Sequence, residues 1–361
     1  MSYIFSKKLV ANSRSCQREM TKQLAVLNEH RAKAENANGG LMMLLDVIAN
    51  NDAQFKKSDL YVTANAARSP AEAYREFDQT TKMVQNPEGE FGTLMRVMNA
   101  ARSVDIGKQV FEYRKASTAG LAKTSMSGQT GVNLDHVDYD YAGTVVPIHD
   151  TGFGRQWRDV EGMKSDGFDA LVDDAREAEL TLLRKADSYL FDGDADLVVK
   201  GNSWAGIKAD PSVVQYTLNV DLSATASTPE AIRNEVQAAR DVLRIDNNCS
   251  APLKMGVSRE IMSNFERPFS TADGTFGTIL DYVGKLRGIE EIYEDSRLVD
   301  NEIVMFWADQ QGFHAVIGMA MSTYAKPRQY HNSDYEFIKW MAAGFLAKVD
   351  YAGNKCALYG S

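Results

Sequence analysis

Three short stretches of the sequence contain residue types that could do chemistry. The first begins like a calcium-binding loop, with Asp192, Asp194 and Asp196 at the first, third and fifth positions. Such a loop also needs a glycine at its sixth position and a bidentate glutamate at its twelfth. This chain has Leu197 and Ser203 there. We therefore interpret the stretch as a polar turn.

The other two stretches resemble a nucleotide-binding turn and part of a catalytic triad. Gly152 and Gly154 match the first two glycines of a dinucleotide fingerprint, but Trp157 occupies the third position. His149 beside Asp150 could supply half a triad, but no serine or cysteine stands in a nucleophile motif. The histidines are scattered, and neither an HExxH pair nor a phosphate-binding loop occurs. We expect no catalytic site, no cofactor and no bound metal ion.

The composition is that of an ordinary globular protein. Of 361 residues, 44% are hydrophobic and 25% are charged, which is enough for two or three modest cores. Cys16, Cys249 and Cys356 form no CxxC pair, so we expect reduced thiols in a cytoplasmic product. No secretion signal is visible, and the strongest apolar run, 41–49, is shorter than the roughly 20 residues of a membrane span. We expect a soluble protein.

Charge is unevenly distributed along the chain. The net charge of −9 argues against a dedicated nucleic-acid binder, whose domain is usually basic. Residues 1–35 nevertheless contain more basic than acidic side chains. The basic ones are Lys7, Lys8, Arg14, Arg18, Lys22, Arg31 and Lys33. Two interpretations stay open: a solvated helix face, or a terminal arm whose Arg14, Arg18 and Lys22 face DNA.

A second cluster combines basic and aromatic side chains. Arg155, Trp157 and Arg158 lie within four consecutive residues. An arginine and a tryptophan can stack and together reach a carboxylate, which suits a protein interface. The alternative is an exposed surface strand with one buried indole.

Helical spacing dominates the first hundred residues, and then the period changes. We expect helices over 13–35, over 41–49, from the capping residue Ser69 onward, and over roughly 91–103. Residues 109–117 then predict a strand and 134–148 its return, on either side of a Gly-, Ser- and Thr-rich tip at 118–133. An isolated two-stranded ribbon is marginal in water. We therefore expect it to lie against another surface, for which a neighbouring subunit is a natural candidate.

The strongest helix of the sequence spans 166–191. Its predicted apolar stripe consists of Phe168, Leu171, Val172, Ala175, Leu182, Ala186 and Tyr189. After a linker at 197–212, alternation predicts a strand over 214–222 and a capped helix from Ser227 through Arg244. Strands at 253–257, 289–293, 302–307 and 313–319 follow, with helices near 258–266 and 275–287 between them. Strands return in 321–358. The stretch from 214 to 319 indicates a compact α/β or α+β domain.

This order of elements resembles a known fold. The resemblance lies in TVVPIHDTGFGRQWRDVEGMKSDGFDALVDDAREAELTLLRKADSYLFDGD and the GNSWAGI that follows at 201–207. Phe191-Asp192-Gly193 and Gly206-Ile207 match an apolar-Phe-x-Gly ending and a nearby Gly-Ile. From about residue 105 onward, the chain is similar to the HK97-like fold of tailed-bacteriophage major capsid proteins and encapsulins.

The resemblance implies an α+β, HK97-like capsid fold and a division of the chain. Residues 1–68 would form a helical N-terminal arm, and 69–108 would form the entry helices of the P domain. The extended E-loop would span 109–148, and the P domain with its spine helix at 166–191 would span 149–207. The A domain would span 208–318, and 319–361 would supply closing strands of the P domain.

The same resemblance implies a structural role and not an enzyme. The chain would self-assemble as hexamers and pentamers into an icosahedral head shell around double-stranded DNA, with weak non-specific DNA contact and no membrane. Its partners would include portal, scaffold and decoration proteins, and it would be assembled in the host cytoplasm as part of the virion capsid. An encapsulin-like compartment around a cargo enzyme is the alternative, and a cytosolic enzyme of unknown reaction is a distant one.

Particular residues follow as candidates for contacts between subunits. They are Lys115, Lys123, Tyr139, Tyr141, Arg155, Trp157 and Arg158. Some relatives also join their subunits by an isopeptide bond between a loop lysine and an asparagine, for which Lys115, Lys123 and Asn354 would be the candidates here. No motif marks a desolvated glutamate that could serve as the base, so we expect no cross-link.

Overall fold

The computed structural model describes 82, 84–127, 129, 131, 134–165, 169–270 and 276–361, together with 21, 22, 24–26, 28 and 29. The chain divides into two compact units, Met1–Lys82 and Met83–Ser361. In the first unit, the described residues between 21 and 29 are helical, as the sequence predicts. The helices expected at 41–49 and from Ser69 onward lie outside the described residues.

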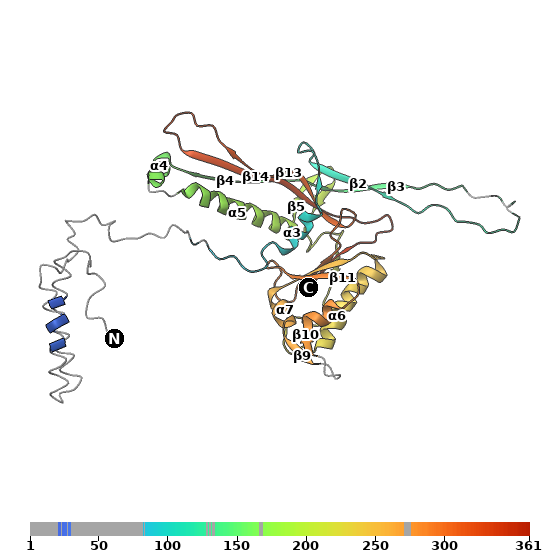
Figure 1. Cartoon of the computed structure of the whole chain (residues 1–361). Helices are drawn as coiled ribbons and strands as arrows, with labels where there is room; N and C mark the ends of the chain where they lie inside the picture. The colour runs from blue at the N-terminus through green and yellow to red at the C-terminus, as the bar shows by residue number, and fades with distance from the viewer. Residues whose placement is uncertain are drawn as a thin grey trace. The chain divides into compact units, whose positions relative to one another are not determined.

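The second unit contains a four-stranded sheet with the order β1-β13-β14-β4. Its strands are β1 (Arg102–Ser103), β13 (Phe313–Ala325), β14 (Tyr335–Ala347) and β4 (Ile148–Arg155). The long helix α5 (Ala170–Asp192) packs against β4 and β14 (Figure 1). Lys339 of β14 links this strand to α5, since its Nζ donates to the Ala175 carbonyl at 3.1 Å and pairs with Glu179 at 2.8 Å.

A five-stranded mixed sheet has the order β11-β8-β12-β15-β7. Its strands are β11 (Ile289–Glu294), β8 (Leu253–Val257), β12 (Ile303–Phe306), β15 (Ala357–Gly360) and β7 (Val214–Tyr216). The helices α6 (Pro229–Asp241), α7 (Arg259–Phe265) and α8 (Ile279–Gly284) accompany it, with a π-helical turn η2 (Val242–Asp246) and the short pair β9 (Pro268–Ser270) and β10 (Phe276–Thr278). Thr228, Ser258 and Thr278 accept the free amides at the three helix starts, as capping predicts.

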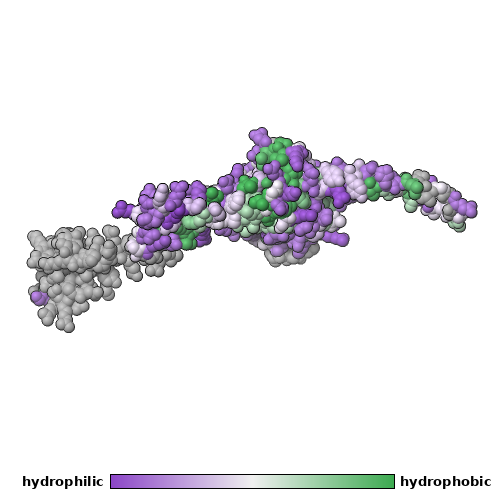
Figure 2. All heavy atoms as spheres, turned by 90° about the horizontal axis from the view of Figure 1, so that it is seen from above, coloured by the Kyte–Doolittle hydropathy of each residue, from purple (hydrophilic) through white to green (hydrophobic). Residues whose placement is uncertain are grey.

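Two ribbons complete the described architecture, together with two shorter helices. The ribbon of β2 (Val110–Ala116) and β3 (Tyr139–Val145) extends from the four-stranded sheet, and separate apolar patches lie among polar residues along it (Figures 1 and 2). A second ribbon pairs β5 (Asp194–Val199) with β6 (Asn202–Trp204). The helices are α3 (Gly92–Asn99) and α4 (Trp157–Ser165).

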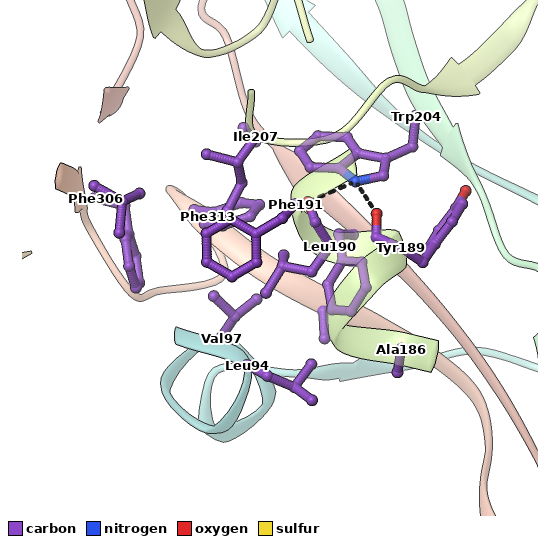
Figure 3. Packing of buried hydrophobic residues seen from close by; sticks show 14 of the residues in the cluster. Leu94, Val97, Ala186, Tyr189, Leu190, Phe191, Trp204, Ile207, Phe306 and Phe313 are labelled. Atoms are coloured by element: carbon purple, nitrogen blue, oxygen red, sulfur yellow. Dashed lines mark hydrogen bonds between the residues drawn. The ribbon is translucent and has the colours of Figure 1, made fainter. Parts of the chain in front are cut away.

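The principal core forms around the end of α5. Trp204 is 1% exposed, and its indole Nε1 donates to the carbonyls of Tyr189 and Leu190 at 3.1 and 3.3 Å. Figure 3 shows Leu94 and Val97 of α3 on the opposite side of this helix end from Trp204. A second core lies in the five-stranded sheet and its helices, and a small third one lies where Val146 packs on Val316, Ala342 and Leu346 of β13 and β14.

Two glycines explain the Phe-x-Gly and Gly-Ile pattern physically. Gly193 ends α5 with φ 63°, and Gly206 has φ 85°, both in the left-handed range that favours glycine. A Cβ on Gly193 would lie 2.3 Å from the Ala205 carbonyl carbon, and one on Gly206 would lie 2.3 Å from the Phe191 oxygen. The two segments therefore touch backbone to backbone at this point.

Several sequence predictions need correction. Residues 197–212 are not a plain linker, because β5 and β6 pair there. The alternating stretch 214–222 forms a strand only over Val214–Tyr216, because the chain turns at Asp221, whose side chain accepts the Ser223 amide. Val172 is 64% exposed and not part of the buried stripe. The helix expected at 91–103 ends at Asn99, where the chain turns into β1.

The cysteine prediction also needs correction. Cys249 and Cys356 form a disulfide with a Cα–Cα distance of 5.6 Å, within the usual range. They are 107 residues apart in the sequence, and the fold brings the segment before β15 beside the chain that follows η2. Cys16 lies outside the described residues.

Candidate subunit-contact surfaces

The base of the β2–β3 ribbon is firmly attached to the four-stranded sheet. Tyr113 donates its hydroxyl to the Val349 carbonyl at 3.0 Å and accepts the Val349 amide at 2.7 Å. Burial raises the pKa of Tyr113. Glu112 accepts the Asn202 side-chain amide at 2.9 Å, which links the ribbon to β6. These contacts fix the direction in which the ribbon leaves the sheet.

The far part of the ribbon has exposed apolar side chains. Beyond the bond from the Ser117 amide to the Asp138 carbonyl, the described residues of the tip form no strand. Leu121, Met126 and Leu134 are almost fully exposed, and Tyr139 and Tyr141 are 62% and 61% exposed. Several exposed apolar groups along a thin ribbon are typical of a segment that packs on another molecule.

The two ribbon lysines make contacts within their own chain. Lys115 pairs with Asp140 at 2.8 Å, directly opposite it in the strand register, and this hydrogen bond raises the pKa of Lys115. Lys123 is exposed, and its Nζ donates to the Gly131 carbonyl at 3.1 Å. Asn354 donates its side-chain amide to Asp350 at 2.6 Å. All three cross-link candidates therefore have partners in their own chain.

The basic–aromatic cluster is divided among three surroundings. Arg155, at the end of β4, makes a bidentate pair with Asp174 of α5, which raises the pKa of Arg155. Trp157 begins α4, with its ring 6.2 Å from that of His331 in the β13–β14 turn. Arg158 is exposed to solvent. The exposed-strand interpretation is therefore wrong for Trp157, because the chain becomes helical there.

An open groove of about 660 Å³ lies between β4 and α5. Its lining includes Phe153, Asp159, Asp174, Glu177 and the paired Arg155. Carboxylates outnumber the one arginine among these residues, so the groove is acidic. It is a second candidate surface for contact with another protein.

The stretches that suggested chemistry are separated by the fold. His149 is buried against the Tyr189 ring at a centroid distance of 5.3 Å, and burial lowers its pKa, whereas Asp150 points to the exposed face of β4. Asp192 pairs with Arg297, while Asp194 begins β5. In the part of the chain that the structure describes, no three His, Cys, Asp or Glu side chains gather as metal ligands.

The arm residues can be placed only in part. Lys22 is exposed on the helical segment of the first unit, and Arg14 and Arg18 lie outside the described residues. No helix among the described residues is long and apolar enough to cross a membrane.

Sequence reasoning missed the buried carboxyl groups of Asp187 and Asp295. Asp187 lies four residues after Leu183 and four before Phe191, so it occupies an inward-facing row of α5. That spacing was the available signal. Asp295 directly follows β11 and carries no comparable signal in the sequence.

The same fold occurs in solved capsid structures. The capsid of Myoviridae phage XM1 matches with a TM-score of 0.58 and 10% identity, over 81% of this chain and 99% of that chain. The capsid of a native GTA particle matches with a TM-score of 0.51 and 13% identity, over 82% and 99%. The mature capsid of bacteriophage PhiM1 matches with a TM-score of 0.50 and 14% identity, over 85% and 98%.

These likenesses confirm the predicted fold class, an α+β fold of the HK97-like capsid type. The chain belongs to the family described as "Family of unknown function (DUF6260)", whose model matches residues 64–360. No curated protein matches the chain.

Proposed function

We propose that this chain is the major capsid protein of a tailed bacteriophage and self-assembles into the icosahedral head shell around double-stranded DNA. The observation that carries the proposal is the β2–β3 ribbon, which is anchored at its base and exposes apolar side chains beyond it. In a closed shell, each ribbon would cover those groups against the next subunit. The fold shared with phage capsids supports the same interpretation.

The proposed division of the chain into domains follows the two sheets. The ribbon and its tip, 109–148, would be the E-loop, and α5 with the four-stranded sheet would be the P domain. The A domain, 208–318, would hold four strands of the five-stranded sheet and its helices, and β15 of the closing segment 319–361 would complete that sheet. Residues 1–68 and 69–108 would be the arm and the entry to the P domain.

The proposed contacts between subunits use the exposed candidates. Tyr139, Tyr141 and Arg158 are available at the surface, whereas Lys115 and Arg155 are ion-paired within their own chain. We propose that Lys115 stabilises the ribbon through Asp140, and that Arg155 stabilises the wall of the groove through Asp174. Many modest contacts would act together in the shell, because linked binding events become effectively intramolecular.

The subunit would act without catalysis, as a part of the virion capsid assembled in the host cytoplasm. It would form hexamers and pentamers with portal, scaffold and decoration proteins as further partners, and it would touch packaged DNA weakly. The net charge of −9 supports weak DNA contact, because a basic inner surface would bind DNA tightly. An encapsulin-like compartment around a cargo enzyme is the second candidate, since that class shares the fold type.

The test is assembly of the chain expressed alone, followed by negative-stain electron microscopy. Closed shells or curved sheets are the expected result, and a discrete small oligomer would contradict the proposal. The contents of particles purified from their natural source then separate the two shell classes. Double-stranded DNA inside supports the phage head, and an enclosed enzyme supports the compartment.

A further inference from the structure

Two buried aspartates lie where α5, the start of α3 and the end of β11 meet. Asp187 of α5 is 7% exposed, and Asp295 after β11 is fully buried. Asp295 accepts the Thr93 amide at 2.6 Å and the Arg297 amide at 2.9 Å. The buried Oδ1 of Asp187 has no hydrogen-bond donor among the described residues. The two carboxyl groups therefore differ: Asp295 accepts two backbone amides, whereas the buried Oδ1 of Asp187 accepts none.

The charges that face Asp187 are mainly acidic. They come from Asp295, from Glu90 before α3 and from Asp192 on the same helix, with Arg297 as the opposing cation. Arg297 pairs with Asp192 and donates to the Ser188 hydroxyl at 3.1 Å, so its guanidinium is not a direct partner of Asp187.

Two other arginines beside these elements are also engaged. Arg184 pairs with Glu90 at 2.8 Å and with Glu177 at 3.3 Å. Arg96, which faces Asp295, pairs with Glu291 and stacks on the Tyr293 ring at 3.5 Å. An ionised Asp187 would thus be a buried charge without its own partner, which is costly.

The backbone at this junction leaves little room for rearrangement. A Cβ on Gly92 would lie 2.5 Å from the Glu294 carbonyl oxygen, so the start of α3 presses directly on β11. The Ser296 amide also bonds the Gly89 carbonyl at 3.2 Å. Water can reach the buried Oδ1 of Asp187 only if α5 separates locally from this contact.

Burial is the main reason why the pKa of Asp187 rises to about 7, and the charge of Asp295 adds to the rise. Burial also raises the pKa of Asp295. In the closed junction, Asp187 therefore keeps its proton in mildly acidic solution.

We propose that Asp187 is a proton-operated latch between α5 and the junction of α3 with β11. The protonated carboxyl lets the three elements pack without an unpaired charge. When the O–H bond of the carboxyl breaks, the proton passes to solvent, and the two remaining carboxylates repel each other. The junction then opens locally and lets water reach Asp187. The latch is a property of the folded subunit and holds whether or not the chain forms a shell.

The test is hydrogen exchange of the full chain, read by mass spectrometry on peptides covering 183–192 and 89–97. Rates are measured from pH 5 to 8 and corrected for intrinsic exchange. An opened Asp187 has an ordinary pKa near 4, and its closed-state pKa is raised, so protection is lost as pH rises toward about 7. The opening equilibrium should increase by roughly a hundredfold between pH 5 and 8 and level off above pH 7. A flat profile in the wild-type chain overturns the proposal.

Variants separate the latch from general effects of pH. Asp187→Asn should give a flat profile, and Asp173→Asn, the same change nearer the start of α5, should keep the wild-type profile. Asp295→Asn removes the facing charge, so the midpoint should move to lower pH while a pH dependence remains. A pH dependence that persists in Asp187→Asn overturns the assignment. If that variant fails to fold, an unchanged midpoint in Asp295→Asn overturns it instead.

Discussion

Truncation of Leu182 in α5 tests how the long helix is held against the four-stranded sheet. Leu182 is 1% exposed and belongs to the core that contains Trp204 and Phe345. Replacing it with alanine removes buried methyl groups and leaves a cavity in a close-packed region. We expect the free energy of unfolding to fall by about 2–5 kcal/mol. For a unit of this size the melting temperature should fall by roughly 3–9 °C.

The measurement is urea unfolding and thermal melting of the unassembled subunit, followed by tryptophan fluorescence. Val172→Ala on the same helix is the matched control, because Val172 is 64% exposed and its loss should change stability by less than about 0.5 kcal/mol. Leu171→Ala should fall between the two, since Leu171 is half-buried. Coincident unfolding curves for Leu182→Ala and the wild-type chain would refute the packing argument.

Three further predictions concern assembly. Deleting the tip 118–133 should leave a folded subunit that no longer assembles normally, seen by electron microscopy; wild-type shells would disprove the intersubunit role. Changing Arg14, Arg18 and Lys22 to glutamate should spare assembly and impair DNA packaging, measured as DNA content per particle. Assembly failure would instead assign these residues to protein contacts. Denatured mature particles should run as one band near 40.0 kDa on a gel, and a ladder of multiples would show that subunits are cross-linked.

Elements with a strong local signal could be predicted from the sequence. The strand at 253–257 has the predicted bounds, and the helix after Ser227 begins with its predicted cap region. The ribbon appeared as a change from helical to alternating spacing, which a strand pair needs regardless of its surroundings. Phe191-Asp192-Gly193 and Gly206-Ile207 could be recognised as a pattern, but only the structure shows that the two glycines permit backbone contact.

Features that depend on contacts between distant segments could not be predicted. Residues 214–222 alternate throughout, yet the strand covers only Val214–Tyr216, and beyond the Leu218 amide, which bonds Ser361, the chain turns at Asp221. Cys249 and Cys356 meet across 107 residues, and nothing in their spacing indicates it. In the candidate contact surfaces, Tyr139 and Tyr141 are exposed on the ribbon, and their contact with a second subunit stays a prediction.

Arg155 illustrates why residue type alone could not assign the contacts. An arginine beside a tryptophan suits an interface, but the same guanidinium also suits any carboxylate within reach in its own fold. Asp174 is 19 residues away in sequence and becomes its bidentate partner only because α5 packs along β4. Arg155 is therefore already ion-paired within its own chain. Its effect on a second subunit would come through the shape and net charge of the groove that it lines. Since Asp159 and Glu177 line the same groove, a partner that binds there should be basic.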